Sequence, residues 1–385
     1  MFSYAEAFAS RRKSARREKS IGSGLDTVNS IVERTQAFCR RFELRVPILL
    51  APMAGACPAS LSIAVANAGG LGACGVLLMQ PDEIKIWARD VRAGSNGSFQ
   101  LNNWIPDPPP ARDSVHEARV RAFLGHWGPT VAPEAGEAAT PDFAAQCEAM
   151  LEADPRIISS IMGLYPEEFV AKMKVRGIAW WATATTVVEA RAAVAAGADV
   201  IIAQGAEAGG HRGAFNAAEA ESRQVGLIAL LPAIVNAVDV PVVATGGIAD
   251  ARGVAAAFVL GASAAQIGTG FLRSPEAKIA PAWADALVRT APEDTLVSRV
   301  FSGRPGRSIA TAYARAATAP EAPAPAPYPI QRGLTAGMRG LGTKENNIDQ
   351  IQAWAGQSAA LAAAEPASAI VERAWTGAQA LLGLS

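Results

Sequence analysis

From residue 46 to residue 267 the chain keeps one rhythm, in which short apolar runs alternate with Ala-rich helical stretches and Gly-containing turns. Continuous apolar runs of this length are typical of parallel strands buried on both faces. Eight such strands with helices between them favour a (β/α)8 TIM barrel over a doubly wound sheet. The predicted strands are Val46–Ala51, Leu71–Cys74, Phe99–Trp104, Arg156–Ile161, Ile178–Thr183, Asp199–Ala203, Pro241–Ala244 and Ala264–Ile267. The predicted helices are Ala59–Ala68, Pro81–Arg92, Pro141–Glu152, Pro166–Val175, Val187–Ala196, Gly226–Val238 and Asp250–Leu260.

The rhythm divides the chain into four segments. Residues 1–42 are expected to form a basic, partly disordered extension, and residues 43–272 the barrel, interrupted by a Pro-rich excursion from Pro106 to Thr140. Residues 273–347 are expected to form a cap or lid, with an extended segment where residues 320–329 hold five prolines. Within residues 348–385 the stretch Ile348–Leu382 looks helical again, and this segment is expected to form a closing helix on the barrel.

Composition narrows the class of protein. The formal net charge of the 385 residues is zero, which gives no electrostatic reason to expect nucleic acid or a membrane surface as a partner. No run approaches the roughly 18 apolar residues of a membrane span, and no apolar core follows the basic N-terminus to make a signal peptide. Four scattered cysteines without a CxxC pair argue against a metal site and fit a reducing cytoplasm.

The loop from Ala203 to Gly213 is the strongest candidate for chemistry. It reads AQGAEAGGHRG and follows the sixth predicted strand, at the end of the barrel where active sites lie. Its glycines let backbone approach a ligand closely, and His211 is one of only three histidines in the chain. A lone histidine is usually a packing residue, but this position favours a catalytic His211 in a glycine-rich turn.

Two further Gly-rich turns follow the seventh and eighth predicted strands. Gly246 and Gly247 lie in TGGIAD, while Gly268 and Thr269 lie in IGTG. In barrels this is a common place for a phosphate, held by backbone N–H groups and a helix N-terminus. Ordinary turn glycines are the alternative, but two such turns in adjacent units favour phosphate binding.

The ends of the first and third predicted strands complete the candidate site. Pro52, Met53 and Gly55 follow the first strand and could support a flat cofactor ring, although Met53 alone would more often be a core residue. Asn102 lies near the end of the third strand, where a buried amide must be hydrogen-bonded to cofactor or protein.

Taken together, these motifs resemble the nitronate monooxygenase family, once called 2-nitropropane dioxygenases. The combination of GGHRG with WAGQ is more specific than GGIAD, which occurs in other FMN barrels. The resemblance runs from Pro47 to the C-terminus. It is carried by PILLAPMAG, NAGGLGACG, AQGAEAGGHRG, VVATGGIAD, IGTGFL, SGRPGR, YPIQRGLT and WAGQSA.

The resemblance implies non-covalent FMN, molecular oxygen as co-substrate, an alkyl nitronate as substrate and no metal. It places Pro52, Met53 and Gly55 at the flavin ring, and Asn102 and Gln204 in hydrogen bonds to the flavin or ribityl groups. His211 matches the family's active-site histidine. The residues implied to hold the ribityl phosphate region are Gly209, Gly246, Gly247, Gly268 and Thr269.

The chain departs from the family pattern in three places. The first forty or so residues have no counterpart, Asn103 stands where an apolar residue is expected, and the Pro106–Thr140 excursion could reshape the substrate mouth. These departures leave the physiological nitronate open.

The chemistry also leaves alternatives. His211 could hold the anionic nitronate as an imidazolium, or take the α-proton of a neutral nitroalkane as a base. An NAD(P)H-dependent flavin reductase acting on quinones or enoyl thioesters is the first alternative function, and a non-enzymatic flavin- or phosphate-binding protein is the second. A homo-oligomer is compatible with the sequence, which does not decide the oligomeric state.

Overall fold

In a computed structural model, which describes residues 24–95 and 97–384, eight parallel strands form a barrel. The strand order is β1-β9-β8-β6-β5-β4-β3-β2, and a bridge between Leu49 and Leu71 joins the first strand to the last. This confirms the predicted (β/α)8 class. The strands are β1 (Ile48–Leu50), β2 (Gly72–Gly75), β3 (Phe99–Trp104), β4 (Ile157–Ile161), β5 (Ala179–Ala184), β6 (Val200–Gln204), β8 (Val242–Thr245) and β9 (Ala264–Ile267).

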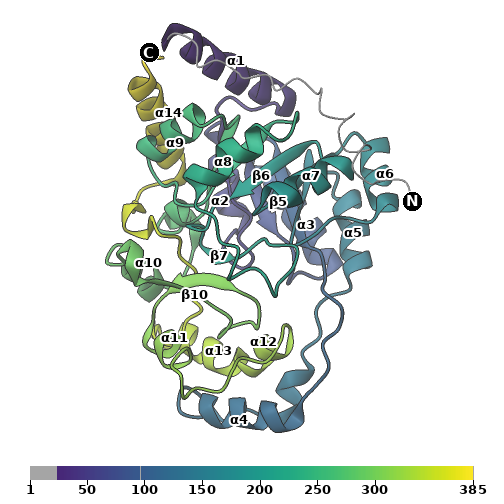
Figure 1. Cartoon of the computed structure of the whole chain (residues 1–385), viewed down its shortest axis with the longest axis vertical. Coiled ribbons are helices and arrows are strands. Elements are labelled where there is room, and N and C mark those ends of the chain that lie inside the picture. Colours follow the sequence, from purple (N-terminus) through teal and green to yellow (C-terminus); the bar gives the residue numbers. More distant parts are fainter. Residues whose placement is uncertain (1–23, 96, 385) are drawn as a thin grey trace, which may run out of the picture.

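Seven of the helices around the barrel follow the sequence rhythm (Figure 1). Gly197, which directly follows the predicted helix Val187–Ala196, has a left-handed φ of 100°, which glycine adopts without a steric penalty. The seven are α2 (Ala59–Asn67), α3 (Pro81–Gly94), α5 (Phe143–Glu152), α6 (Glu167–Val175), α7 (Val187–Ala195), α8 (Leu227–Val235) and α9 (Ala251–Val259).

The eighth barrel helix comes from the far end of the chain. Helix α14 (Ala367–Leu382) contacts α9, α2 and β1, and its Trp375 ring lies 6.0 Å from that of Phe258. The expectation that the whole of 348–382 is helical was wrong. Residues 351–358 are extended or turning because Trp354 bridges to Ser308 and the chain there runs across the barrel mouth; the 3-10 helix η5 (Ala359–Leu361) follows.

Alternate strand residues face opposite sides of the barrel wall. Ile158 and Trp180 pack outward against the helices, whereas Ile157, Trp181 and Ile202 fill the interior. Asn103 also faces outward, where its Nδ2 donates to Gln146 Oε1 of α5 at 2.9 Å. The departure at Asn103 is therefore a buried strand-to-helix contact and lies outside the substrate mouth.

Helix α1 (Gly24–Phe42) closes the amino-terminal end of the barrel. Phe42 packs edge-on against Trp181 with ring centroids 4.9 Å apart, and Phe38 lies 4.9 Å from Phe42. Residues 24–42 thus form a packed helix where we expected part of a basic, partly disordered extension, because their aromatic face completes the barrel core. The basic cluster at residues 11–19 lies outside the described residues.

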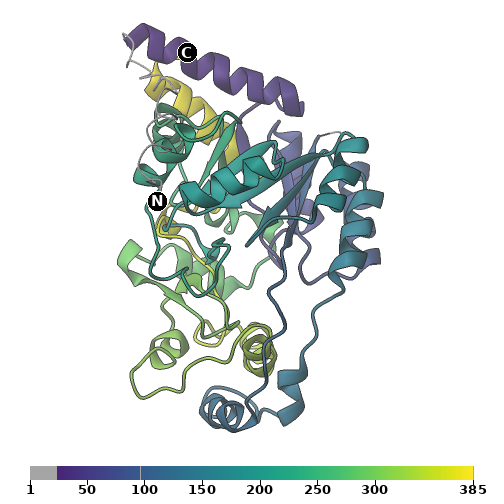
Figure 2. The ribbon, with the colours of Figure 1, turned by 45° about the vertical axis from the view of Figure 1, so that its right-hand side comes forward.

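A second lobe, the cap, covers the carboxyl end of the barrel (Figure 1). The excursion after β3 packs into it, since Val120 and Leu124 share a core with Phe301, Tyr313 and Leu334. Figure 2 shows two long segments leading from the barrel to α4. Elements after β9 are η2 (Thr269–Phe271), η3 (Pro275–Ala277), α10 (Pro281–Leu287), η4 (Pro292–Asp294), β10 (Thr295–Ser298), β11 (Gly306–Ile309), α11 (Ala312–Ala316), α12 (Ile330–Leu334) and α13 (Ala336–Lys344). Those of the excursion are α4 (Ser114–Leu124) and η1 (Pro133–Glu137).

The barrel and cap therefore do not follow the chain as two consecutive segments. Two separate segments of the chain build the cap: one lies between β3 and α5, and the other lies between β9 and α14. No helix in the described part of the chain is long and apolar enough to cross a membrane.

Candidate active site

A cavity of about 340 Å³ opens where the barrel strands end and the cap begins. All of the residues singled out from the sequence lie on its wall, although they come from five different strand ends. Those residues are Pro52, Met53, Gly55, Asn102, Gln204, Gly209, His211, Gly246, Gly247, Gly268 and Thr269.

The cavity also has lining residues that the sequence analysis did not single out. Ser302, Tyr328, Arg332 and Trp354 stand within motifs that carried the family resemblance, but nothing in their spacing assigned them to the cavity. Thr183, Thr245 and Gln266 could have been found from their place near strand ends. Trp104 ends the third predicted strand and gave the same signal, whereas Arg339 and Gln352 gave none, because only the fold of the cap brings them to the barrel.

His211 lies in a short strand, β7 (Gly210–His211), and not in the turn we expected. The strand pairs antiparallel with β11 of the cap, so that His211 faces Gly306. His211 Nε2 lies 2.7 Å from Ser302 Oγ, and the imidazole is flanked by the rings of Trp104 and Trp354 at 4.5 and 4.7 Å. The barrel strand β3 therefore supports the imidazole on one side through Trp104, and the cap holds it through Trp354 and the hydrogen bond to Ser302.

This environment disfavours a charged imidazole. Burial, together with the positive charges of Arg304 and Arg332, lowers the pKa of His211 from its ordinary value of 6.5 to about 3. His211 is therefore neutral near pH 7.

The two arginines that act on His211 differ in their partners. Arg304 is buried, forms an ion pair with Asp107 at 2.5 Å and donates to the carbonyl of Ala214. Arg332 lines the cavity, and its guanidinium has no hydrogen-bond or ion-pair partner within residues 24–95 and 97–384. Burial lowers its pKa, yet an arginine stays charged at neutral pH. The cavity therefore carries a cation that the protein leaves free for a ligand.

Gln204 holds the His211 loop in place. Its Nε2 donates to the carbonyl of His211 at 3.2 Å, and its Oε1 accepts from the N–H of Gly213 at 2.8 Å. Arg212 is buried below the loop and donates to the carbonyls of Gly205 and Gln204. These bonds set the path of the backbone that carries His211.

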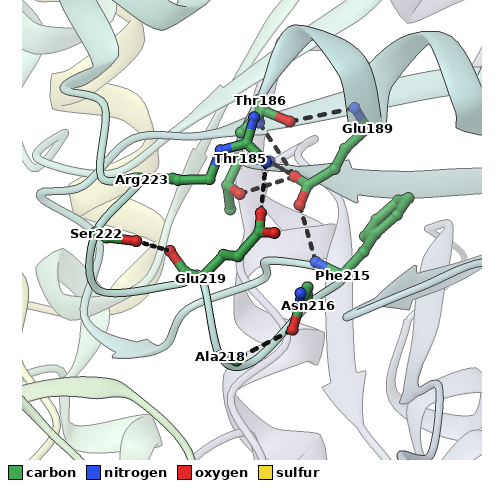
Figure 3. Close-up of polar contacts among 9 residues, drawn as sticks. All are labelled: Thr185, Thr186, Glu189, Phe215, Asn216, Ala218, Glu219, Ser222 and Arg223. Carbon is green, nitrogen blue, oxygen red and sulfur yellow. Dashed lines mark hydrogen bonds and ion pairs between the residues drawn. The ribbon is translucent and has the colours of Figure 1, made fainter.

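The segment after Gly213 is tied to helix α7 (Figure 3). Glu189 accepts from the N–H groups of Thr185 and Thr186 with one carboxylate oxygen and from that of Phe215 with the other. Further along, Arg223 pairs with Glu219. One carboxylate therefore links the segment after Gly213 to the first turn of α7.

The two Gly-rich turns after β8 and β9 lie against the His211 loop. Gly246 and Gly247 have φ values of 112° and 69°, which only glycine adopts without strain. The N–H groups of Gly246, Gly247, Gly268 and Thr269 have no hydrogen-bond partner among the described residues. A helix N-terminus, which we expected to help, is already capped: Asp250 accepts from the first turn of α9. An anion here would therefore meet donors of the loops and not the N-terminus of α9.

Gly209 makes a close contact that explains why it is glycine. A Cβ at this position would lie 2.5 Å from the nitrogen of Gly356 and 3.0 Å from Thr269 Oγ1. Gly356 in turn donates to Thr269 Oγ1 at 3.0 Å. The WAGQ segment, the His211 loop and the turn after β9 thus interlock through Gly209.

Residues 37–375 match the sequence model of the family described as nitronate monooxygenase. The chain belongs to the nitronate monooxygenase family. It is 36% identical over 330 residues to a nitronate monooxygenase of Paraburkholderia phytofirmans, covering 84% of this chain and 90% of that protein. A probable nitronate monooxygenase of Bacillus subtilis is 35% identical over 324 residues, covering 83% and 92% respectively.

Solved structures agree with this membership. A nitroalkane oxidase from Streptomyces ansochromogenes superposes with a TM-score of 0.81 at 33% identity, covering 91% of this chain and 100% of that one. FabK from Thermotoga maritima gives a TM-score of 0.71 at 26% identity, covering 90% and 97%. The resemblance found in the sequence is confirmed, and membership makes this chain a flavin-dependent oxidoreductase that acts on nitronates.

The cavity of this family member fits a phosphorylated flavin. The turns after β8 and β9 supply several free N–H groups, and the Thr269 hydroxyl, which accepts from Gly356, finds no acceptor for its own proton among the described residues. Asn102 and Gln266 bring side-chain amides to the wall. Among the described residues no cluster of His, Cys, Asp and Glu could hold a metal ion.

Proposed function

We propose that this protein uses FMN and molecular oxygen to oxidise alkyl nitronates to a carbonyl compound and nitrite. The observation that carries the proposal is that a neutral His211 and an unpartnered Arg332 line one cavity, beside two turns whose N–H groups have no partner among the described residues. A nitronate is an anion that needs a cation, and its neutral parent nitroalkane needs a base to become one.

Each part of the cavity has a role in this proposal. Gly246, Gly247, Gly268 and Thr269 would bind the FMN phosphate region, with Gly209 holding these turns against the WAGQ segment. The loop of Pro52, Met53 and Gly55 would support the ring, and Asn102 and Gln204 would line its polar side. When bound, FMN supplies the electron-transfer chemistry, while the protein supplies position and electrostatics.

Arg332 and His211 would divide the work on the substrate. Arg332 would bind the negatively charged NO2 group, since its guanidinium is charged at every relevant pH and has no partner of its own. His211 would act as a neutral imidazole that takes the α-proton of a nitroalkane. The low pKa of His211 argues against the other role open to it, an imidazolium that holds the anion.

The test is direct. The purified protein is reconstituted with FMN, its absorption spectrum is recorded, and oxygen uptake is followed with ethyl nitronate and propionate 3-nitronate. Nitrite should appear in step with oxygen uptake. Absence of uptake with both nitronates by flavin-loaded protein would reject the proposal.

A flavin reductase that uses NAD(P)H is the second candidate, and the similarity to FabK favours it among the alternatives. The similarity to the nitroalkane oxidase is greater in both identity and TM-score. Anaerobic mixing with NADH or NADPH separates the two functions, because only a reductase would bleach the bound flavin rapidly.

A further inference from the structure

Four buried polar side chains cross the barrel interior just below the cavity. Ser159 Oγ donates to Gln100 Oε1 at 3.0 Å and accepts from Asn102 Nδ2 at 3.0 Å. Gln100 Nε2 donates to Gln266 Oε1 at 3.2 Å and to the carbonyl of Leu50 at 3.3 Å. Gln100 and Ser159 are fully buried, whereas Asn102 and Gln266 also line the cavity.

The carbonyl of Leu50 sets the direction of this relay. This carbonyl lies where β1 and β2 close the barrel, which we call the seam. In a regular parallel pair it would accept the next backbone hydrogen bond, from the N–H of Ala73. That N–H donates instead to Ser62 Oγ at 3.1 Å, so the carbonyl is left for Gln100. A carbonyl oxygen only accepts, so Gln100 must point its NH2 group toward Leu50 and its oxygen toward Ser159.

Every other orientation follows from that one. Because both N–H bonds of the Gln100 amide are used, Gln266 must present its oxygen to Gln100 and turn its own NH2 group away. Because the Ser159 proton goes to Gln100, Asn102 must give Ser159 its NH2 group and turn its oxygen away. Neither Asn102 Oδ1 nor Gln266 Nε2 has a partner among the described residues, and neither is sealed from the cavity.

We propose that this relay gives the cavity a fixed acceptor at Asn102 and a fixed donor at Gln266, and that Gln100 and Ser159 are positioning residues for the flavin. The inference rests on the proposed function, since it takes the ligand to be FMN. The oxidised flavin ring has a single N–H group, between two carbonyls, so its polar edge requires both an acceptor and donors. Without the relay, either amide could turn and present the opposite group.

Three successive hydrogen bonds thus connect the Leu50 carbonyl to Asn102, and through them the carbonyl sets which group Asn102 presents to the cofactor. The acceptor at Asn102 favours the oxidised flavin, whose electron-poor ring makes its N–H the stronger donor. Release of Asn102 from Ser159 would therefore weaken FMN binding and raise the midpoint potential of the bound flavin.

The test uses two neighbouring serines of β4. Ser159→Ala removes the hydroxyl that holds Asn102, while Ser160→Ala removes an equally buried hydroxyl that faces outward and accepts from Trp180 Nε1 at 3.1 Å. FMN affinity and midpoint potential are measured for the wild type and both variants. We expect Ser159→Ala to raise the FMN dissociation constant about tenfold, as for one well-placed hydrogen bond, and to raise the potential. Ser160→Ala should leave both unchanged, and Ser159→Thr, which keeps the hydroxyl, should restore wild-type values.

The proposal would be overturned if Ser159→Ala had the FMN affinity and midpoint potential of the wild type. It would also be overturned if Ser159→Ala and Ser160→Ala changed these two quantities equally. If Ser159→Ala does not fold, the wild type is titrated with FMN and with FMN methylated at its ring N–H. Equal affinity for the two flavins would overturn the acceptor assignment, and weaker binding of the methylated flavin would support it. Failure of the wild type to bind FMN would remove both the relay and the proposed function, whereas FMN binding without nitronate turnover would remove only the proposed function.

Discussion

His211 and Ser302 are 91 residues apart in the sequence, and a hydrogen bond of 2.7 Å joins His211 Nε2 to Ser302 Oγ. The bond connects the loop after β6 to the cap, and the pairing of β7 with β11 runs beside it. The imidazole is therefore positioned by both lobes, and its chemistry depends on their being docked.

His211→Asn should keep FMN but lose turnover unequally. Asparagine retains a polar side chain, but it cannot take a proton. Turnover of neutral nitroalkanes should fall by about 10²–10⁴-fold, the usual contribution of a general base. Turnover of preformed nitronates should fall much less. Steady-state oxygen uptake with each form measures this, and equal losses would reject the base role.

Arg332→Met should weaken binding of the nitronate. The change removes the one cavity-lining guanidinium that has no partner in the described structure, while it keeps most of the side-chain volume. Loss of a charged hydrogen bond is worth about 1.5–3 kcal/mol, so KM for nitronates should rise by roughly 10- to 100-fold with FMN retained. Arg315→Met is the matched control, because Arg315 is exposed and pairs with Asp294. A normal KM in Arg332→Met would assign the anion to another group.

The activity should depend little on pH where free histidine titrates. The pKa of His211 in the free enzyme is lowered to about 3, so kcat/KM should show no limb near pH 6.5. Arg332 contributes to this lowering, and Arg332→Met should therefore move the acidic limb upward. Profiles of kcat/KM for a nitroalkane, measured in both proteins, test this. An acidic limb near pH 6.5 in the wild type would contradict the environment described for His211.

The stability of the folded protein should depend on pH through the lowered pKa of His211. The pKa of His211 is lower in the folded than in the unfolded protein, so the neutral imidazole favours the folded state. This contribution to the free energy of unfolding is complete above pH 6.5 and is lost as the pH falls toward 3. The unfolding midpoint of His211→Asn should consequently fall less than that of the wild type as pH is lowered from about 7 to 5. Thermal scans of both proteins without flavin make the comparison, and parallel curves would count against it.

Gly209→Ala should impair flavin retention. The added Cβ would lie 2.5 Å from the Gly356 nitrogen, so the WAGQ segment or Thr269 must move. Because both border the proposed phosphate site, the FMN dissociation constant should rise at least about tenfold. Gly340→Ala in α13 is the control, since a Cβ there meets no atom within 4 Å. Normal FMN affinity in Gly209→Ala would show that the contact yields without cost.

Phe42→Ala should destabilise the barrel without touching the cavity. Phe42 is buried between Phe38 and Trp181 at the opposite end of the barrel. Truncation of such a ring costs about 3–5 kcal/mol, which denaturant unfolding would measure. Glu33→Ala, on the same helix and exposed, should change little. If both variants unfold alike, α1 contributes less to the core than its packing indicates.

The sequence by itself determined the barrel and most of one wall of the site. The alternation of apolar runs with Ala-rich stretches is local, since strand burial and helix periodicity are written in consecutive residues. Strands that end together in a barrel bring Asn102, His211 and Gly246 to one face, whatever the loops between them do. That rule, with the motifs of the family, is why eleven residues chosen from sequence line one cavity.

Only the tertiary structure decided what surrounds His211. Arg332 lies 121 residues after His211, and Trp104 lies 107 residues before His211. No periodicity of the sequence links the three positions. Their meeting depends on how the excursion after β3 and the segment after β9 pack into one cap core. The neutral state of the imidazole, the free guanidinium and the orientation of Asn102 each result from long-range burial and partners, which local sequence does not specify.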